Sequence, residues 1–216
     1  IIEPVKRSQT SLFRAIDAYR KNDLNFTLIV NPRVGEFKAN QLDLIKELNT
    51  HLDGYNNCQY GIILDGQFTV AQVEKVLKDH APSDVALNFI HLQATDPAAL
   101  EKLSEKYTVR MNLIHGNITD RHYNKKLKFA PCARLDNAFK SQIKNADYAN
   151  IVDEPFTMEH IYFKEDSYGG FSDYLTIGDE YQEGGCLPYA VAFHLTYKVG
   201  DEIRVRHFVS DSNFDN

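Results

Sequence analysis

Short apolar runs alternate with amphipathic segments through the first half of the chain. The apolar runs cover residues 1–6, 26–30, 60–64, 85–91 and 109–115. They are short and almost continuously apolar, which is typical of strands in a parallel sheet whose two faces are both buried. The pattern therefore predicts a parallel sheet at the centre of the fold.

The segments between these runs carry apolar residues at helical spacing. Such stripes cover residues 8–21, 42–48, 70–77 and 97–106. Thr69 stands where it can cap the third of these helices, and Pro97 stands in the first turn of the fourth, where its fixed φ is favourable. The chain is thus predicted to alternate strand and helix through at least five strands.

Two of the predicted strands end in the same motif. Residues 88–91 and 112–115 both read Asn-apolar-Ile-His, and each is followed after three residues by Thr-Asp, a helix-capping pair. The two copies start 24 residues apart, about the length of one strand and one helix with short loops. The repeat predicts two equivalent strand–helix units whose polar strand ends face a common rim.

Two architectures fit this alternation, a closed (β/α) barrel and an open doubly wound sheet. The sequence contains neither a G-x-G-x-x-G turn after the first strand nor a P-loop lysine motif, the usual nucleotide signals of open sheets. We therefore predict an α/β fold of (β/α) barrel type, similar to a TIM barrel, as a single domain over residues 1–216. Because the chain begins inside an apolar run and stops after an apparent strand, we expect a further strand before it and a helix after it.

The second half departs from the alternation. A short strand is predicted over residues 129–132 and a helix over 138–146. The segment 153–188 is rich in aromatic residues, acids and glycine, and we expect it to fold over the barrel mouth. Two β-rich runs joined through Gly200-Asp201 predict a C-terminal antiparallel hairpin, with His194 and His207 facing each other across it.

Polar residues that can carry chemistry stand at the predicted strand ends. They are Glu3, Asn31, Asp65, His91 and His115. Glu3, Asp65, His91 and His115 are candidate catalytic residues, because two imidazoles and two carboxylates can work as acid and base. His91, His115 and Asp65 could instead hold a divalent metal. The structural alternative is that each residue caps a loop or bonds the backbone at the rim.

A second set of residues could bind a ligand at the same mouth. It consists of Lys6, Asn31, Arg33, Asp173 and Tyr174. Lys6 and Arg33 follow two strand ends and would attract an anion, whereas Asp173 and Tyr174 belong to the aromatic segment that we expect to cover the mouth. The structural alternative is that the two cations are solvated loop charges and that Asp173 caps a turn.

The composition of the chain argues against several classes of protein, including nucleic-acid-binding and membrane proteins. The 216 residues are 43% hydrophobic and 25% charged with a net charge of −6, so the chain gives no direct signal of nucleic-acid binding. No apolar run reaches the roughly 20 residues of a membrane span, and the start does not read as a signal peptide. Cys58, Cys132 and Cys186 form no C-x-x-C pair and fit reduced thiols. These features predict a cytoplasmic protein that does not bind a membrane.

Several stretches resemble a known bacterial family. They are residues 1–6, 28–32, 170–178, 190–197 and 206–213. Together they are similar to an uncharacterised family of the sce type, related to Beta-family proteins, and the similarity runs over nearly the whole chain. Members of that family tend to lie beside a nuclease-like protein on variable genomic islands. The resemblance implies a nuclease-like protein partner and a role in conflict with phage, but it implies no particular reaction.

Two functional hypotheses follow, and they leave open whether the protein is an enzyme. The first is a ligand-binding or partner-binding subunit of a two-protein phage-defence-type system. The alternative is a metal-dependent hydrolase that uses the strand-end histidines and carboxylates with a divalent metal. Histidines on neighbouring strands resemble those of metal-dependent amidohydrolases, although the His-x-His pair of that family is absent here.

Overall fold

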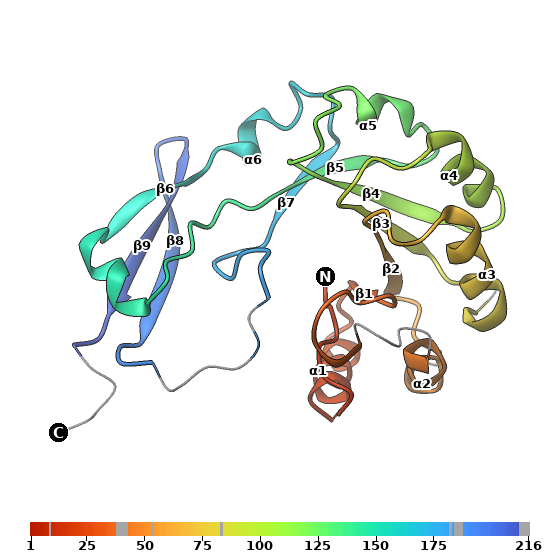
Figure 1. Cartoon of the computed structure of the whole chain (residues 1–216), viewed down its shortest axis with the longest axis horizontal. Coiled ribbons are helices and arrows are strands. Elements are labelled where there is room, and N and C mark those ends of the chain that lie inside the picture. The colour runs from red at the N-terminus through yellow and green to blue at the C-terminus, as the bar shows by residue number, and fades with distance from the viewer. Residues whose placement is uncertain are drawn as a thin grey trace. The chain divides into compact units, whose positions relative to one another are not determined.

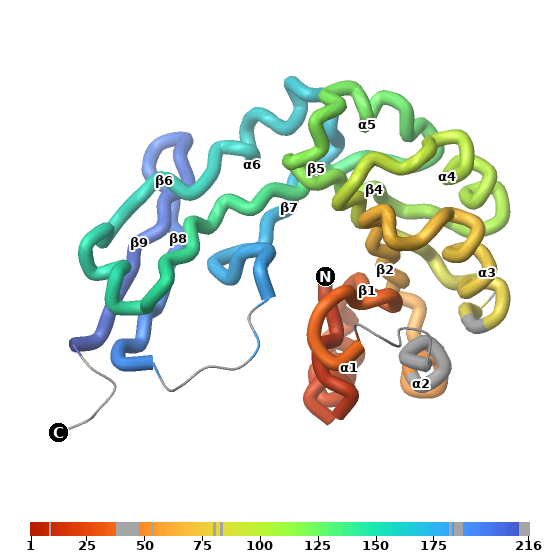
Figure 2. The backbone as a smooth tube through the Cα atoms, in the orientation of Figure 1, coloured from red at the N-terminus to blue at the C-terminus, as the bar shows by residue number. Residues whose placement is uncertain are grey.

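The computed structural model describes residues 1–8, 10–37, 43–52, 54–82, 84–181, 183 and 188–211. The chain divides into two compact units, Ile1–Arg134 and Leu135–Asn216, whereas the sequence predicts one domain over residues 1–216. Figures 1 and 2 trace each unit by its colour along the chain. The division has a physical basis, because the second unit packs a sheet of its own around its own aromatic residues.

The first unit alternates strand and helix, as the hydrophobic pattern predicts. In chain order its elements are α1 (Thr10–Lys21), β1 (Phe26–Ile29), η1 (Gly35–Phe37), α2 (Asp43–Leu52), β2 (Cys58–Leu64), α3 (Val70–His80), β3 (Leu87–His91), α4 (Pro97–Ser104), β4 (Val109–His115), α5 (Tyr123–Lys126) and β5 (Cys132–Asp136). The predicted strand over residues 1–6 is reduced to a single parallel bridge between Ile2 and Leu28.

The strands of the first unit form a curled parallel sheet. β1, β2, β3 and β4 pair in parallel in the order of the sequence, and β5 follows β4 in the same sheet. In Figure 1 these four strands curve like part of a barrel wall, with α3 and α4 on the convex side. The prediction of an α/β fold with a barrel-like parallel sheet is confirmed in this form.

Helix caps lie where the sequence predicts them. The Thr69 side chain accepts a hydrogen bond from Gln72 N, and the Gln72 side chain bonds back to Thr69 N, a capping box that starts α3. In the first copy of the repeated motif Asp96 caps α4 ahead of Pro97. In the second copy Asp120 accepts from His122 N instead, and only the four-residue α5 follows. The same motif thus opens helices of different length.

A glycine allows close packing on one face of the sheet. Thr27, Gly61 and Asn88 lie on this face, and Asn88 Nδ2 donates to Thr27 Oγ1 at 2.6 Å across the glycine between them. A Cβ at Gly61 would lie 2.6 Å from Ile29 Cδ1, 2.8 Å from Thr27 Cγ2 and 3.2 Å from Ile90 Cδ1. All four neighbours are buried, so the glycine is part of a dense core.

The second unit is built on a three-stranded antiparallel sheet. Its elements are η2 (Asn145–Asn150), β6 (Asp153–Thr157), α6 (Glu159–Tyr162), β7 (Gly170–Asp173), β8 (Ala192–Val199) and β9 (Glu202–Val209), and the sheet has the order β6-β9-β8. The predicted hairpin is confirmed, since β8 and β9 pair from Ala192–Val209 to Val199–Glu202. Gly200 takes the positive φ of +58° that its turn requires.

One face of this small sheet is its core. Tyr148 of η2 and Phe139 stack on each other and pack against His194 and His207, and all except the half-buried His194 are buried. The helix predicted over residues 138–146 is wrong. Residues 137–144 are irregular, because Phe139 must turn into this core and Gln142 N bonds the Tyr148 hydroxyl instead of a helical carbonyl.

Candidate functional site

Three of the predicted site residues, Glu3, Arg33 and Asp65, come together at one end of the first unit. The Arg33 side chain pairs with Asp65, with Nε 2.6 Å from Oδ2, and the Arg33 backbone N–H donates to Glu3 Oε1 at 2.6 Å. The Arg33 and Asp65 side chains are only 9% and 12% exposed. Burial raises the pKa of Glu3, although the hydrogen bonds from the backbone of Arg33 and Val34 oppose this effect. These groups bind one another and hold the rim of the sheet.

The side-chain amide of Asn31 takes the place of a backbone amide in the hydrogen-bond ladder between strands. Its Oδ1 accepts from Ile63 N at 2.8 Å and its Nδ2 donates to Ile63 O at 3.0 Å, so its amide continues the β1–β2 ladder after the backbone has left it. The structural alternative thus accounts for Asn31. Lys6 is exposed, and its role in binding an anion stays a prediction.

The ion pair between Arg33 and Asp65 should stabilise the folded protein. Asp65→Asn removes the carboxylate charge that pairs with the nearly buried Arg33 guanidinium, and we expect the free energy of unfolding to fall by about 2 kcal/mol. The matched control is Glu74→Gln, which removes the partner of the exposed Lys106 and should leave stability nearly unchanged. Urea unfolding of both variants measures the difference. Equal losses would contradict a stabilising role for the buried pair.

His91 is the centre of a buried polar network. It is 0% exposed, its Nδ1 lies 3.0 Å from the Tyr123 hydroxyl and its Nε2 lies 3.1 Å from Asn112 Oδ1. Asn112 Nδ2 donates to Ala130 O, so its Oδ1 accepts and His91 carries its proton on Nε2. Burial lowers the pKa of His91 to about 4. This imidazole is neutral at physiological pH and both of its nitrogens are engaged within the protein.

His115 lies at the same end of the sheet on the other face. In the β3–β4 register His91 pairs with Ile114, so the next residue, His115, points to the opposite side from His91. Its Nδ1 accepts from Asn117 N at 3.2 Å. The two imidazoles therefore face away from each other, an arrangement that does not support the predicted metal site of His91, His115 and Asp65. Across the described residues, no group of three or more His, Cys, Asp or Glu side chains is arranged to hold a metal ion.

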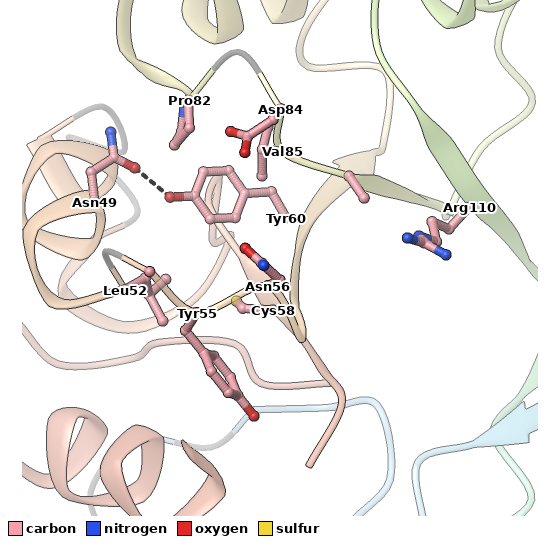
Figure 3. Close-up of a pocket in the computed structure, with 12 residues that line it drawn as sticks. Asn49, Leu52, Tyr55, Asn56, Cys58, Tyr60, Pro82, Asp84, Val85 and Arg110 are labelled. Carbon is pink, nitrogen blue, oxygen red and sulfur yellow. Dashed lines mark hydrogen bonds between the residues drawn. The ribbon is translucent and has the colours of Figure 1, made fainter. Parts of the chain in front are cut away.

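A cavity opens at the other end of the sheet, where β2, β3 and β4 begin. Its volume is about 460 Å³, within the usual range for small-molecule sites, and Figure 3 shows its walls. Tyr60, Leu52 and Cys58 are buried in its wall, and the Tyr60 hydroxyl bonds Asn49 of α2. Burial raises the pKa of the Cys58 thiol to about 12. The sequence gives no sign of this cavity, because its lining comes from strand starts and loops without a motif.

The chemistry of the cavity is polar and weakly charged. Asp84 and Arg110 are exposed in its lining, and Asn56 lies next to Cys58 in Figure 3. One acid and one base with amide groups between them suit a small hydrogen-bonding ligand better than an apolar one. The barrel prediction expects ligands at the carboxyl ends of the strands, and this cavity lies at their amino ends.

The second unit contains a histidine pair that the sequence predicts. His194 and His207 are direct partners in the β8–β9 register, with their Nδ1 atoms 2.7 Å apart. One Nδ1 must carry a proton and the other must not. Burial and then the neighbouring His207 lower the pKa of His194. Glu154 Oε1 lies 3.4 Å from His207 Nε2, and its Oε2 lies 3.0 Å from Lys140 Nζ. The hydrogen bond between the two histidines links β8 to β9, and Tyr148 packs on both rings.

The opposite face of the same sheet is exposed and apolar at one end. Phe193 and Phe208 are direct cross-strand partners and are 61% and 47% exposed, and Leu195 beside them is 49% exposed. Arg206 lies over the Phe208 ring at 5.6 Å. We call Phe193, Leu195, Arg206 and Phe208 the apolar face. The sequence carries a signal for this face, because apolar residues alternate with polar ones on both strands of the hairpin.

Asp173 and Tyr174 lie at the end of β7 in the second unit. Asp173 Oδ1 accepts from Leu175 N at 2.7 Å, so this carboxylate holds a turn, as the structural alternative expects. Part of the segment 153–188, residues 182 and 184–187, lies outside the described residues together with Cys186. A contribution of Asp173 or Tyr174 to a ligand site, and the placing of this segment over a barrel mouth, stay predictions.

The comparisons with known proteins found no relative of this chain. No family model, no curated protein and no solved structure matches it. Among the described residues, no helix combines the length and the apolar character needed to cross a membrane.

Proposed function

We propose that this chain is a partner-binding subunit and that its second unit holds another protein on the apolar face. The observation that carries the proposal is the exposure of three large apolar side chains side by side, Phe193, Leu195 and Phe208. Scattered exposed apolar residues are ordinary on a protein surface, but neighbouring aromatic rings on one rigid sheet face are typical of interface anchors. The histidine pair and Tyr148 hold the sheet rigid from behind.

The charges around the apolar face indicate the chemistry of the partner. Arg204 is engaged by Asp153 at 2.6 Å and by Glu202 at 2.6 Å, whereas the exposed Arg206 lies among apolar side chains. A surface that fits should present aliphatic or aromatic side chains and a carboxylate for Arg206. The proposed partner is the nuclease-like protein that the family resemblance implies, within a two-protein phage-defence-type system.

The alternative, a metal-dependent hydrolase, has less support. Its metal ligands would be His91, His115 and Asp65, but the first two face opposite sides of the sheet and Asp65 pairs with Arg33. Ligand binding at the carboxyl ends of the strands is likewise disfavoured, because Glu3, Asn31 and Arg33 are bonded to the sheet rim.

We also propose that the parallel sheet belongs to a TIM-barrel-like fold. Strand order that follows the sequence, parallel pairing and a helix after each of β2, β3 and β4 support this. In a fold of that kind the sheet serves as a scaffold for the second unit, which carries the binding surface.

The test of the partner proposal is a charge placed on the apolar face. We expect Phe193→Asp to weaken binding to the nuclease-like partner at least tenfold in titration calorimetry, because it replaces a central anchor with a desolvated charge. The matched control is Ile143→Asp, which charges an apolar residue of the same unit that is 96% exposed and lies off this face. The proposal fails if Phe193→Asp and wild type bind the partner equally well.

A further inference from the structure

The two edges of the small antiparallel sheet differ in how they are protected. β6, at one edge, has five residues, contains Pro155 and shifts register against β9 between Pro155 and Thr157. Proline removes a donor from the edge and a register shift bends the strand, and both discourage pairing with another chain. β8, at the other edge, has eight residues, no proline and an unbroken register with β9. Only the β8 edge is therefore shaped to accept a further strand.

The hydrogen bonds show which backbone groups of β8 face outward. Val191 O accepts from Ser210 N at 3.0 Å and Val191 N donates to Ser210 Oγ at 3.0 Å, so the odd-numbered residues bond toward β9. His207 N donates to Val152 O, away from its β8 partner His194, which agrees with this alternation. Consequently the N–H and C=O groups of Ala192, His194, Thr196 and Lys198 point away from β9. In the described part of the chain β8 pairs with β9 alone.

The sequence of β8 is complementary to itself in one antiparallel register. If His194 of one copy pairs with Thr196 of another, Leu195 meets Leu195, Phe193 meets Tyr197 and Ala192 meets Lys198. Apolar side chains then oppose apolar ones on one face, and no two like charges oppose each other. The neighbouring register, with Thr196 against Thr196, would place His194 against Lys198 and Phe193 against Val199, and it lacks the contact between the two Leu195 side chains.

We propose that two copies of this chain pair through their β8 edges into a dimer with twofold symmetry. The two sheets join into one sheet of six strands in the order β6-β9-β8-β8-β9-β6. The protected β6 edges end it on both sides, so assembly closes at two copies and no fibre grows. Edge pairing leaves the apolar face of each copy open and sets the two faces side by side. This inference rests on the strand edge and is independent of the proposed partner.

A disulfide tests both the dimer and its register. In the proposed pairing the two Leu195 residues form a non-hydrogen-bonded pair, whose Cα atoms approach to roughly 4.5 Å, a distance that a disulfide spans. With Cys186 replaced by serine, Leu195→Cys should oxidise to a covalent dimer on a non-reducing gel. Phe193→Cys is the matched control, because Phe193 faces Tyr197 of the other copy and should not crosslink. Equal crosslinking of the two variants, or none of Leu195→Cys, would overturn the pairing.

Backbone substitution at the edge tests the same contact in solution. Thr196→Pro removes an outward N–H without removing a bond to β9, and we expect light scattering after gel filtration to show a monomer. Thr196→Val keeps the N–H and should remain a dimer, as should the wild type. Each dimer should have about twice the 24.7 kDa mass of one chain. A monomeric wild type refutes the proposal, and so does a Thr196→Pro variant that stays a dimer. If proline unfolds the sheet by circular dichroism, the Leu195→Cys result decides.

Discussion

Replacing Gly61 with valine is expected to lower the free energy of unfolding by about 3 kcal/mol, at the upper end of the usual range for overpacked cores. The added Cβ would already lie 2.6 Å from Ile29 Cδ1 and 2.8 Å from Thr27 Cγ2 before the two methyl groups are placed. Thr27 cannot easily turn away, because its β-branched side chain is stiff and its hydroxyl is bonded to Asn88. Urea unfolding followed by circular dichroism measures the loss.

A compensating variant separates this clash from a general effect on the strand. Ile29→Val deletes the Cδ1 atom that lies closest to the new Cβ. Combined with Gly61→Val it should return part of the lost stability, so the two changes should be non-additive. Additive losses in the double variant would show that the clash with Ile29 is not the cause.

Acid should destabilise the first unit through His91. Its pKa is about 4 in the folded protein and 6.5 as a free side chain, so the unfolded chain binds the proton more tightly. The stability that the neutral imidazole contributes is fully present above pH 6.5 and is lost as the pH falls from 6.5 to about 4. A difference of this size corresponds to about 3 kcal/mol. Urea unfolding at a series of pH values between 4 and 7 gives the slope.

The variant His91→Leu identifies the source of that slope. It cannot titrate, so the part of the pH dependence that belongs to His91 should vanish. Its stability at pH 7 should also fall, because Asn112 and Tyr123 lose a buried partner. His122→Gln, at an exposed histidine, is the control and should keep the wild-type slope. An unchanged slope in His91→Leu would mean that other groups cause the acid sensitivity.

The repeated motif illustrates what sequence can and cannot predict here. It correctly predicts two strands that end in histidine, and the caps Thr69 and Asp96 are predicted from residue type alone. Aligned copies would pair His91 with His115, but the register shifts between Leu87 and Asn88, and His91 pairs with Ile114. A shift of one residue turns a side chain to the other face, so two equal motifs have unequal environments. Register depends on contacts across the sheet, which a linear pattern does not contain.

The rim residues can be predicted as a group, but their contacts with one another cannot. Sequence places Glu3, Arg33 and Asp65 at strand ends, and the structure brings them together. That Arg33 uses both its backbone and its side chain to bind the other two could not be foreseen, because loop conformation decides it. The apolar face was overlooked for the opposite reason. Its pattern is visible in the sequence, but the face on which a hairpin packs is set by distant residues such as Tyr148.

The burial of the Cys58 and Cys132 thiols limits how readily these two side chains react with oxidants. Burial raises the pKa of Cys58 to about 12 and that of Cys132 to about 11. At neutral pH only about one Cys58 side chain in 10⁵ is a thiolate, the nucleophilic form that attacks peroxides and disulfides. Cys58 and Cys132 are therefore weak nucleophiles at neutral pH and should react slowly with oxidants.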